Sequence, residues 1–253
     1  MSSYYRGPSS GGGMTIQVPP ITPMLRLIMW TLVVCFALQS FSELLFEYQT
    51  PTTWLQLSRV GVTEHLALWQ LVTYALLHGG IWHLLMNLLG LWMFGGDVER
   101  VLGSRGFVRY LVICIVGGGV AYLATAMLTG SNSPVIGASA GVLGVLVAFA
   151  VFFPERELFL FPLPFPIKAR TLALIYGAID LYNAMASNLG HSAATTSGGG
   201  VVAFTAHLGG MLVGFLYLVI FVRGGGIGWR NPFKKSRPFR VIQGRRNDPF
   251  DIH

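Results

Sequence analysis

The chain has 253 residues, of which 53% are hydrophobic and only 11% are charged, and its net charge is +7. Soluble domains carry about 25% charged residues, so this composition excludes an ordinary soluble globular protein and is typical of a membrane protein. In a soluble protein the positive charge would suit nucleic-acid binding. A membrane protein needs basic residues on one side of the bilayer, so we predict a lipid-bilayer environment and no nucleic-acid partner.

Six apolar segments are long enough to cross a bilayer, which takes roughly 18 residues or more. In chain order they are 23–42, 81–101, 107–128, 135–153, 167–185 and 200–222. They predict an all-α, polytopic membrane protein with a single six-helix domain over 21–223. The polar, Gly- and Ser-rich segment 1–20 is predicted to be disordered, and 224–253 is predicted to be a basic tail.

The first outward loop, over 43–80, is long and contains Trp54, Trp69 and Tyr74 among Leu and Val. Amphipathic segments with Trp and Tyr lie at membrane interfaces. We therefore expect this loop to rest on or partly within the outer leaflet.

The basic residues gather on one side of the predicted six-helix bundle. Those on this side are Arg6, Arg26, Arg100, Arg105, Arg109, Arg156, Lys168, Arg170, Arg223, Arg230, Lys234, Lys235, Arg237, Arg240, Arg245 and Arg246. Only Arg59 falls on the other side. Cytoplasmic loops carry an excess of Lys and Arg, so both termini are predicted to be cytoplasmic. We predict a multi-pass protein of a bacterial plasma membrane, with a tail drawn to anionic lipid.

Four polar residues lie near the outer ends of the predicted helices that run from outside to inside. His83 and Asn87 are on the second helix, Ser139 on the fourth and His207 on the sixth. At a rise of 1.5 Å per residue, each lies about 3–11 Å below the outer end of its helix. His83 and Asn87 are four residues apart and share one helix face. Polar groups within a span are costly, so these four are the candidate functional residues.

These residue types can form an acyl-transfer site. A serine hydroxyl becomes a nucleophile when a base takes its proton, and histidine is the usual base near neutral pH. The oxyanion that follows needs hydrogen-bond donors, which His83, Asn87 and the backbone N–H of Ser139 can supply. Small residues near the serine and His207 allow the close helix contact that the site requires; they include Gly137, Gly141, Gly144 and Gly210.

The motifs together resemble those of the rhomboid intramembrane serine proteases. The chain has His-Leu-Leu-Met-Asn at 83–87, Gly-Ala-Ser at 137–139 and Ala-His-Leu-Gly-Gly at 206–210, and GGDVERVLGS at 95–104 resembles the turn after the family's second helix. In order and spacing the resemblance covers about residues 65–220. It implies a Ser139–His207 dyad without a third carboxylate, and an oxyanion hole lined by His83 and Asn87. It also implies a transmembrane substrate cut near the outer face. No metal or cofactor is predicted, because the histidines lack a His-x-x-x-His pattern on one helix and have no carboxylate at ligand spacing.

Three positions depart from the family pattern. Ala140 follows the serine where many members have glycine, and Leu143 stands where an aromatic residue often stacks on the catalytic histidine. The family's Trp-Arg in the first outer loop is Trp69-Gln70 here. Leu143 gives some support to an alternative, a rhomboid-like pseudoprotease that binds and escorts membrane proteins without cleaving them. A second alternative is a small transporter, but no two halves of the chain look like repeats.

Two residues have competing interpretations. The Ser139 hydroxyl could bond back to the carbonyl of Val135 and serve only in packing. Asp180 is the one acid expected within a spanning segment. It is either a polar contact near the outer part of the fifth helix or a third catalytic member, and we favour the structural role.

Overall fold

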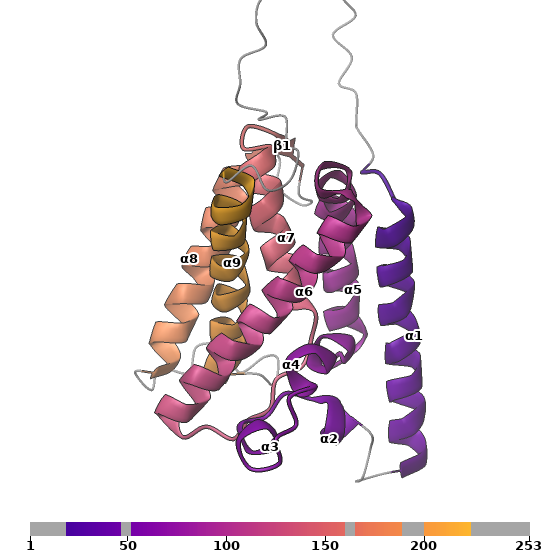
Figure 1. Ribbon diagram of the computed structural model, residues 1–253, viewed down its shortest axis with the longest axis vertical. Helices are drawn as coiled ribbons and strands as arrows, with labels where there is room; N and C mark the ends of the chain where they lie inside the picture. Colours follow the sequence, from indigo (N-terminus) through magenta and orange to yellow (C-terminus); the bar gives the residue numbers. More distant parts are fainter. Residues whose placement is uncertain (1–18, 47–51, 160–164, 189–199, 224–253) are drawn as a thin grey trace, which may run out of the picture.

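The computed structural model describes residues 19–46, 52–159, 165–188 and 200–223. The predictions for the N-terminal segment up to residue 18 and for the tail over 224–253 therefore lie outside the described residues. Figure 1 shows long helices that run alternately up and down between two ends of the molecule. The first of them begins, and the last ends, at the same end of the bundle.

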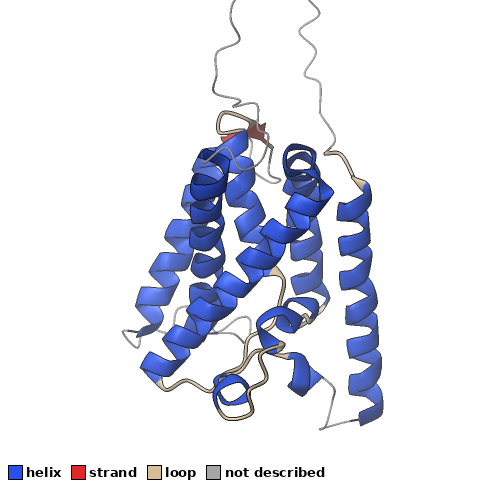
Figure 2. Cartoon of the chain, in the orientation of Figure 1, coloured by secondary structure: helices blue, strands red, loops and turns tan. Residues whose placement is uncertain are grey.

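The long helices match the predicted segments closely. They are α1 (Pro23–Phe46), α5 (Ile81–Gly90), the π-helical turn η2 (Leu91–Gly95), α6 (Gly96–Thr129), α7 (Ser139–Phe152), α8 (Ala169–Asn188) and α9 (Gly200–Arg223). Figure 2 shows that helix dominates the described chain. The described residues also contain a two-residue antiparallel ladder between β1 (Glu157–Leu158) and β2 (Ile167–Lys168), which departs from the predicted all-α class.

The prediction of six spanning segments is supported only in part. Within the part of the chain that the structure describes, three stretches are long and apolar enough to cross a membrane: Pro23–Leu45, Ile81–Thr129 and Ala203–Phe221. The second of these contains both the second and the third predicted helices. α7 is apolar but has only 14 residues. α8 has 20 residues, but Asp180 and two asparagines lower its mean hydropathy.

The predicted loop between the second and third helices, 102–106, is reduced to a break at one residue. Gly103 has φ 71° and ψ 159°, whereas the residues on both sides are helical. Positive φ is cheap only for glycine, so Gly103 turns the chain without a loop. The buried Glu99 beside it accepts hydrogen bonds from Ser104 Oγ at 2.6 Å and from the backbone N–H of Leu25 at 2.9 Å. Glu99 thus ties the break to the first turn of α1.

The fourth helix begins later than the predicted residue 135. Val135 forms an isolated β-bridge with Leu57, and the N–H of Gly137 donates to the carbonyl of Tyr74 at 2.9 Å. Gly137 has φ +121°, which breaks helical geometry before Ser139. At 1.5 Å per residue, α7 is about 21 Å long, which is shorter than the roughly 30 Å hydrocarbon core. An extended segment therefore leads into the bundle, and Ser139 is the first residue of its helix.

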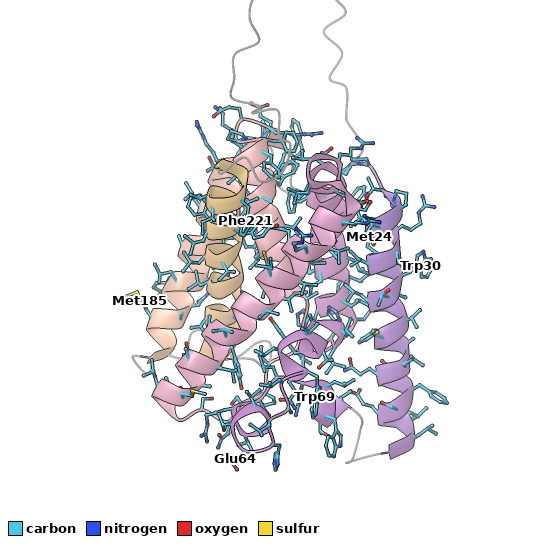
Figure 3. All side chains as sticks on the ribbon, in the orientation of Figure 1. Met24, Trp30, Glu64, Trp69, Met185 and Phe221 are labelled. Atoms are coloured by element: carbon cyan, nitrogen blue, oxygen red, sulfur yellow. The ribbon has the colours of Figure 1, made fainter. Side chains whose placement is uncertain are left out.

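The first outward loop folds into short helical turns at the end of the bundle opposite the start of α1 (Figure 1). They are α2 (Thr52–Leu55), α3 (Arg59–Thr63), α4 (Gln70–Thr73) and η1 (Tyr74–Leu76). Trp54 and Trp69 are exposed, and the indole N–H of Trp69 donates to the carbonyl of Trp54 at 2.9 Å. Figure 3 shows Trp69 at this end of the molecule. Exposed tryptophans at one end of the bundle suit the predicted interfacial position.

Large apolar side chains also cover the sides of the bundle. Figure 3 shows Trp30 of α1 and Met185 of α8 pointing away from the helices, and their exposed fractions are 62% and 58%. Soluble proteins rarely expose large contiguous apolar patches. These side chains suit contact with lipid.

We predict that Glu99→Ala lowers the free energy of unfolding by about 2 kcal/mol, because it leaves buried donors without their acceptor. Thermal unfolding in detergent measures the effect. Glu157→Ala, at an exposed glutamate, is the matched control and should leave the midpoint unchanged. An equal midpoint for both variants would show that Glu99 does not hold α1 to the Gly103 break.

Candidate active site

Ser139 and His207 lie in contact, on different helices. Ser139 is the first residue of α7, and His207 lies in the first half of α9. The Ser139 Oγ and the His207 Nε2 are 2.7 Å apart, within hydrogen-bond distance. Both residues are half-buried. The structure therefore brings the two residues of the predicted dyad together across 68 positions of sequence.

Glycines bring the backbones of α7 and α9 together beside this pair. A Cβ placed on Gly210 would lie 2.3 Å from the carbonyl oxygen of Ala140, so only glycine fits there. A Cβ on Gly118 of α6 would lie 2.5 Å from the Cβ of Ala140. Small residues let transmembrane helices approach closely. Ala140, which stands where many family members have glycine, is accommodated because Gly118 faces it.

Two further predicted packing glycines, Gly141 and Gly144, face α6. A Cβ on Gly144 would lie 2.4 Å from Cys114 Sγ, and one on Gly141 would lie 2.9 Å from Leu111 Cδ1. Cys114 is a free, buried thiol, so it acts here as a small apolar side chain. α7 is thus packed closely against both α6 and α9 by residues near its serine.

The packing interpretation of Ser139 is not what the structure displays. Its hydroxyl contacts His207, while the carbonyl of Val135 accepts the N–H of Leu57 at 3.1 Å. Val135 lies in the β-bridge outside the helix, so its carbonyl is not positioned as an i−4 acceptor on a helical turn.

His83 lies next to Ser139, across Gly137. A Cβ on Gly137 would lie 2.7 Å from His83 Nε2 and 3.7 Å from Ser139 Oγ. His83 Nδ1 accepts the N–H of Gly79 at 3.4 Å. A neutral imidazole that accepts at Nδ1 carries its proton on Nε2. The His83 ring thus lies so close to Gly137 that no Cβ fits there, and its Nε2–H lies on the side of Gly137 that is near the serine.

The buried ring of His78 supports His83 from behind. The two ring centroids are 5.2 Å apart, in an edge-on arrangement with an interplanar angle of 70°. Burial, together with the neighbouring His83, lowers the pKa of His78 to about 4. The ring is therefore uncharged at neutral pH and packs against His83 as an apolar group.

Asn87 lies one turn further along α5 and is buried. Its Nδ2 donates to the backbone carbonyl of His83 at 2.9 Å. The amide group has a second N–H. The N–H of Ser139 belongs to the first turn of α7, where a helix leaves its N–H groups without intrahelical partners. The backbone N–H of Ser139 and the ring of His83 thus lie near the serine hydroxyl, and Asn87 lies on the same helix as His83.

Asp180, whose role the sequence left open, contacts His207. Its carboxylate lies beside the other ring nitrogen of His207, with both Oδ1 and Oδ2 at 3.3 Å from Nδ1. Asp180 belongs to α8, which packs against α9, and its residue surface is 5% exposed. Phe204 meets the same ring edge-on, at 6.4 Å between centroids. The only sequence signal was an acid within a predicted span.

Comparison with known proteins gives the family. A family model described as the Rhomboid domain matches residues 65–224. Rhomboid protein 1, mitochondrial, of Saccharomyces cerevisiae is 29% identical over 181 residues, which are 67% of this chain and 47% of that protein. Rhomboid protease GlpG of Pectobacterium atrosepticum is 28% identical over 197 residues, which are 77% of this chain and 61% of that protein. RHOMBOID-like protein 4 of Arabidopsis thaliana is 32% identical over 180 residues, which are 70% of this chain and 41% of that protein.

The chain belongs to the rhomboid family of helical, multi-pass membrane proteins. The family prediction made from the three motifs is therefore confirmed. The chain spans about half the length of the curated relatives it matches, 47% of the yeast protein and 61% of the bacterial one.

We predict that Gly210→Ala forces α7 and α9 apart and lowers the free energy of unfolding by about 1–3 kcal/mol, the usual cost of overpacking. Chemical or thermal unfolding in detergent measures the change. Gly177→Ala on α8 is the control, since its new Cβ would meet only Met211 Cε at 3.4 Å. It should leave stability unchanged or raise it, because alanine favours helix. Equal stability of the two variants would contradict the close contact.

Proposed function

We propose that this protein is an intramembrane serine endopeptidase that cleaves transmembrane segments of membrane proteins near the outer membrane face. The observation that carries the proposal is the 2.7 Å contact between Ser139 Oγ and His207 Nε2. A hydroxyl so close to an imidazole nitrogen is the arrangement in which histidine takes the proton as serine attacks. The similarity to Rhomboid protease GlpG supports the same activity.

In the first half of the reaction, Ser139 Oγ attacks the carbonyl carbon of the scissile peptide bond. Its proton passes to His207 Nε2, and the carbonyl π electrons move onto the carbonyl oxygen. When this tetrahedral intermediate collapses, the C–N bond breaks and Nε2 gives its proton to the leaving amine. The products are an acyl-enzyme ester on Ser139 and a released C-terminal fragment.

In the second half of the reaction, water hydrolyses the ester on Ser139. His207 Nε2 takes a proton from water as the water oxygen attacks the ester carbonyl. The C–Oγ bond then breaks, and the proton returns to Ser139. Neither half consumes a metal or a cofactor.

The oxyanion of each tetrahedral intermediate needs donors on the side away from His207. His83 Nε2–H, an N–H of Asn87 and the backbone N–H of Ser139 are the proposed donors. The closeness of His83 Nε2 to Gly137, whose Cβ position lies 3.7 Å from Ser139 Oγ, supports this assignment. Donors held in place before the reaction stabilise the developing charge more than water does.

The proposed membrane arrangement has six spans, with both chain ends on the cytoplasmic side of a plasma membrane. The gathering of Lys and Arg at one end of the bundle supports this orientation. The short α7 and the extended segment before it would put Ser139 below the outer surface but near enough for water to reach it. The proposed partners are the bilayer and transmembrane protein substrates.

Cleavage of a transmembrane substrate in proteoliposomes tests the proposal. The wild type should cut the substrate, whereas Ser139→Ala and His207→Ala should not, because each removes one half of the proton transfer. Ser133→Ala, at an exposed serine six residues away, should cut normally. If the wild type binds the substrate without cutting it, the protein is the non-cleaving escort that the family also suggests.

The oxyanion donors make a second, graded prediction. Asn87→Ala and His83→Ala should each lower kcat by about 100-fold, the usual cost of losing one such donor. His65→Ala, at an exposed loop histidine, is the control and should keep full activity. An unchanged kcat in both donor variants would remove His83 and Asn87 from the oxyanion hole.

A further inference from the structure

A carboxylate buried in a membrane helix needs an explanation, because burying an unpaired charge is costly. Asp180 is 5% exposed and lies on α8, a helix that lines the outside of the bundle beside α7 and α9 (Figure 1). Its contact with His207 Nδ1 is to a residue 27 positions away on the neighbouring helix. Large apolar side chains are exposed on both sides of it in sequence, Ile179 and Leu181. The carboxylate thus turns inward, toward the imidazole.

We propose that Asp180 is a positioning residue for His207: it accepts a hydrogen bond from Nδ1–H, so that the unprotonated Nε2 faces the Ser139 hydroxyl. This inference rests on the proposed protease function. It adds a third, acidic member to the pair of residues that the family resemblance implies. The chain of contacts then runs from Asp180 on α8 through His207 on α9 to Ser139 on α7.

The geometry favours a role for the charge. Both carboxylate oxygens lie 3.3 Å from Nδ1, so the carboxylate straddles the N–H. Among the described residues, the buried Asp180 Oδ2 has no hydrogen-bond partner, although it lies 3.3 Å from the imidazole nitrogen. A neutral histidine carries its proton on either Nδ1 or Nε2, and a fixed acceptor at Nδ1 favours the tautomer with the proton on Nδ1. When Nε2 receives the serine proton, the same carboxylate stabilises the imidazolium.

The ring also lacks the support that Leu143 would have given had it been aromatic. Leu143 packs against the core as an aliphatic side chain, and Phe204 meets the His207 ring only edge-on. A hydrogen bond to Nδ1 restricts ring rotation as stacking would. Among the described residues, His83 lies beside Ser139 across Gly137, and the ring of His78 packs edge-on against His83.

A structural role and a positioning role predict different kinetics. If Asp180 only joins α8 to α9, its loss lowers stability and leaves the turnover of the folded fraction unchanged. If it positions His207, its loss lowers kcat at constant KM, because substrate binding does not involve the Nδ1 side of the ring. The amide of Asn has the shape of the carboxylate without its charge, which makes Asp180→Asn the sharpest substitution.

The experiment measures kcat, KM and the thermal midpoint for wild type, Asp180→Asn, Asp180→Glu and the control Tyr182→Phe, whose side chain is exposed on the same helix. Asp180→Asn should lose about 10- to 100-fold in kcat, the range for a charge-assisted hydrogen bond, at unchanged KM. Asp180→Glu should recover part of the loss, and Tyr182→Phe should match wild type. Unchanged kcat in Asp180→Asn, or a loss confined to KM or stability, would overturn the inference.

A spectroscopic readout separates this inference from the proposed function. In wild-type protein labelled with ¹⁵N-histidine, with the His207 signals assigned by their absence in His207→Ala, Nδ1 should be protonated and Nε2 should not. Asp180→Ala should lose this fixed tautomer. A wild-type His207 protonated on Nε2 alone would overturn the role of Asp180, even if the protein cleaves substrate. If His207 has the expected tautomer but the protein cleaves no substrate, the protease function is refuted and the contact between Asp180 and His207 is retained.

Discussion

The contact between the backbones of α7 and α9 is the constraint on which the site depends. Gly210 meets the carbonyl of Ala140 so closely that no side chain fits between the helices. Ser139 directly precedes Ala140, and His207 lies about one helical turn before Gly210. The helix contact therefore sets the distance between the hydroxyl and the imidazole. In lipid, packing of small residues takes over much of the role that the hydrophobic effect plays in water. The same feature therefore supplies stability and chemistry.

The late start of α7 is the second feature on which the site depends. The bridge between Val135 and Leu57 and the positive φ of Gly137 keep the chain out of the helix until Ser139. Ser139 then occupies a helix N-terminus, where free N–H groups favour negative charge. The first outward loop contributes to this arrangement, since Leu57 and the carbonyl of Tyr74 hold the extended segment. A loop that looks peripheral thus fixes the position of the nucleophile.

Much of the architecture could be predicted from the sequence, because hydrophobic length and polar residues within spans are strong signals in membrane proteins. The helices α8 and α9 begin and end within three residues of the predicted segments, and the motifs around His83, Ser139 and His207 named the family. The predicted start of α7 was wrong by four residues, because Val135 forms a β-bridge with Leu57 instead of a helical turn. Apolar residues such as Val135 and Ile136 suit an extended segment as well as a helix. Periodicity cannot separate these two cases over so few residues.

The partner of Asp180 could not be predicted for a different reason. Sequence shows an acid on one helix and a histidine on another, but not which faces of the two helices meet. The carboxylate contacts Nδ1 because α8 packs against α9. This contact depends on tertiary packing, which the sequence does not show. Likewise, the role of Gly103 depends on a single backbone angle, and the sequence does not show whether Gly103 or the nearby Gly106 adopts it.

Peptide mapping by mass spectrometry after treatment with a fluorophosphonate tests the central claim most directly. The reagent phosphonylates a serine hydroxyl only where a base removes its proton, so the account predicts one adduct, on Ser139, that disappears when His207 is replaced by alanine. An adduct that persists at Ser139 without His207, or a folded protein that takes up no reagent, would contradict it.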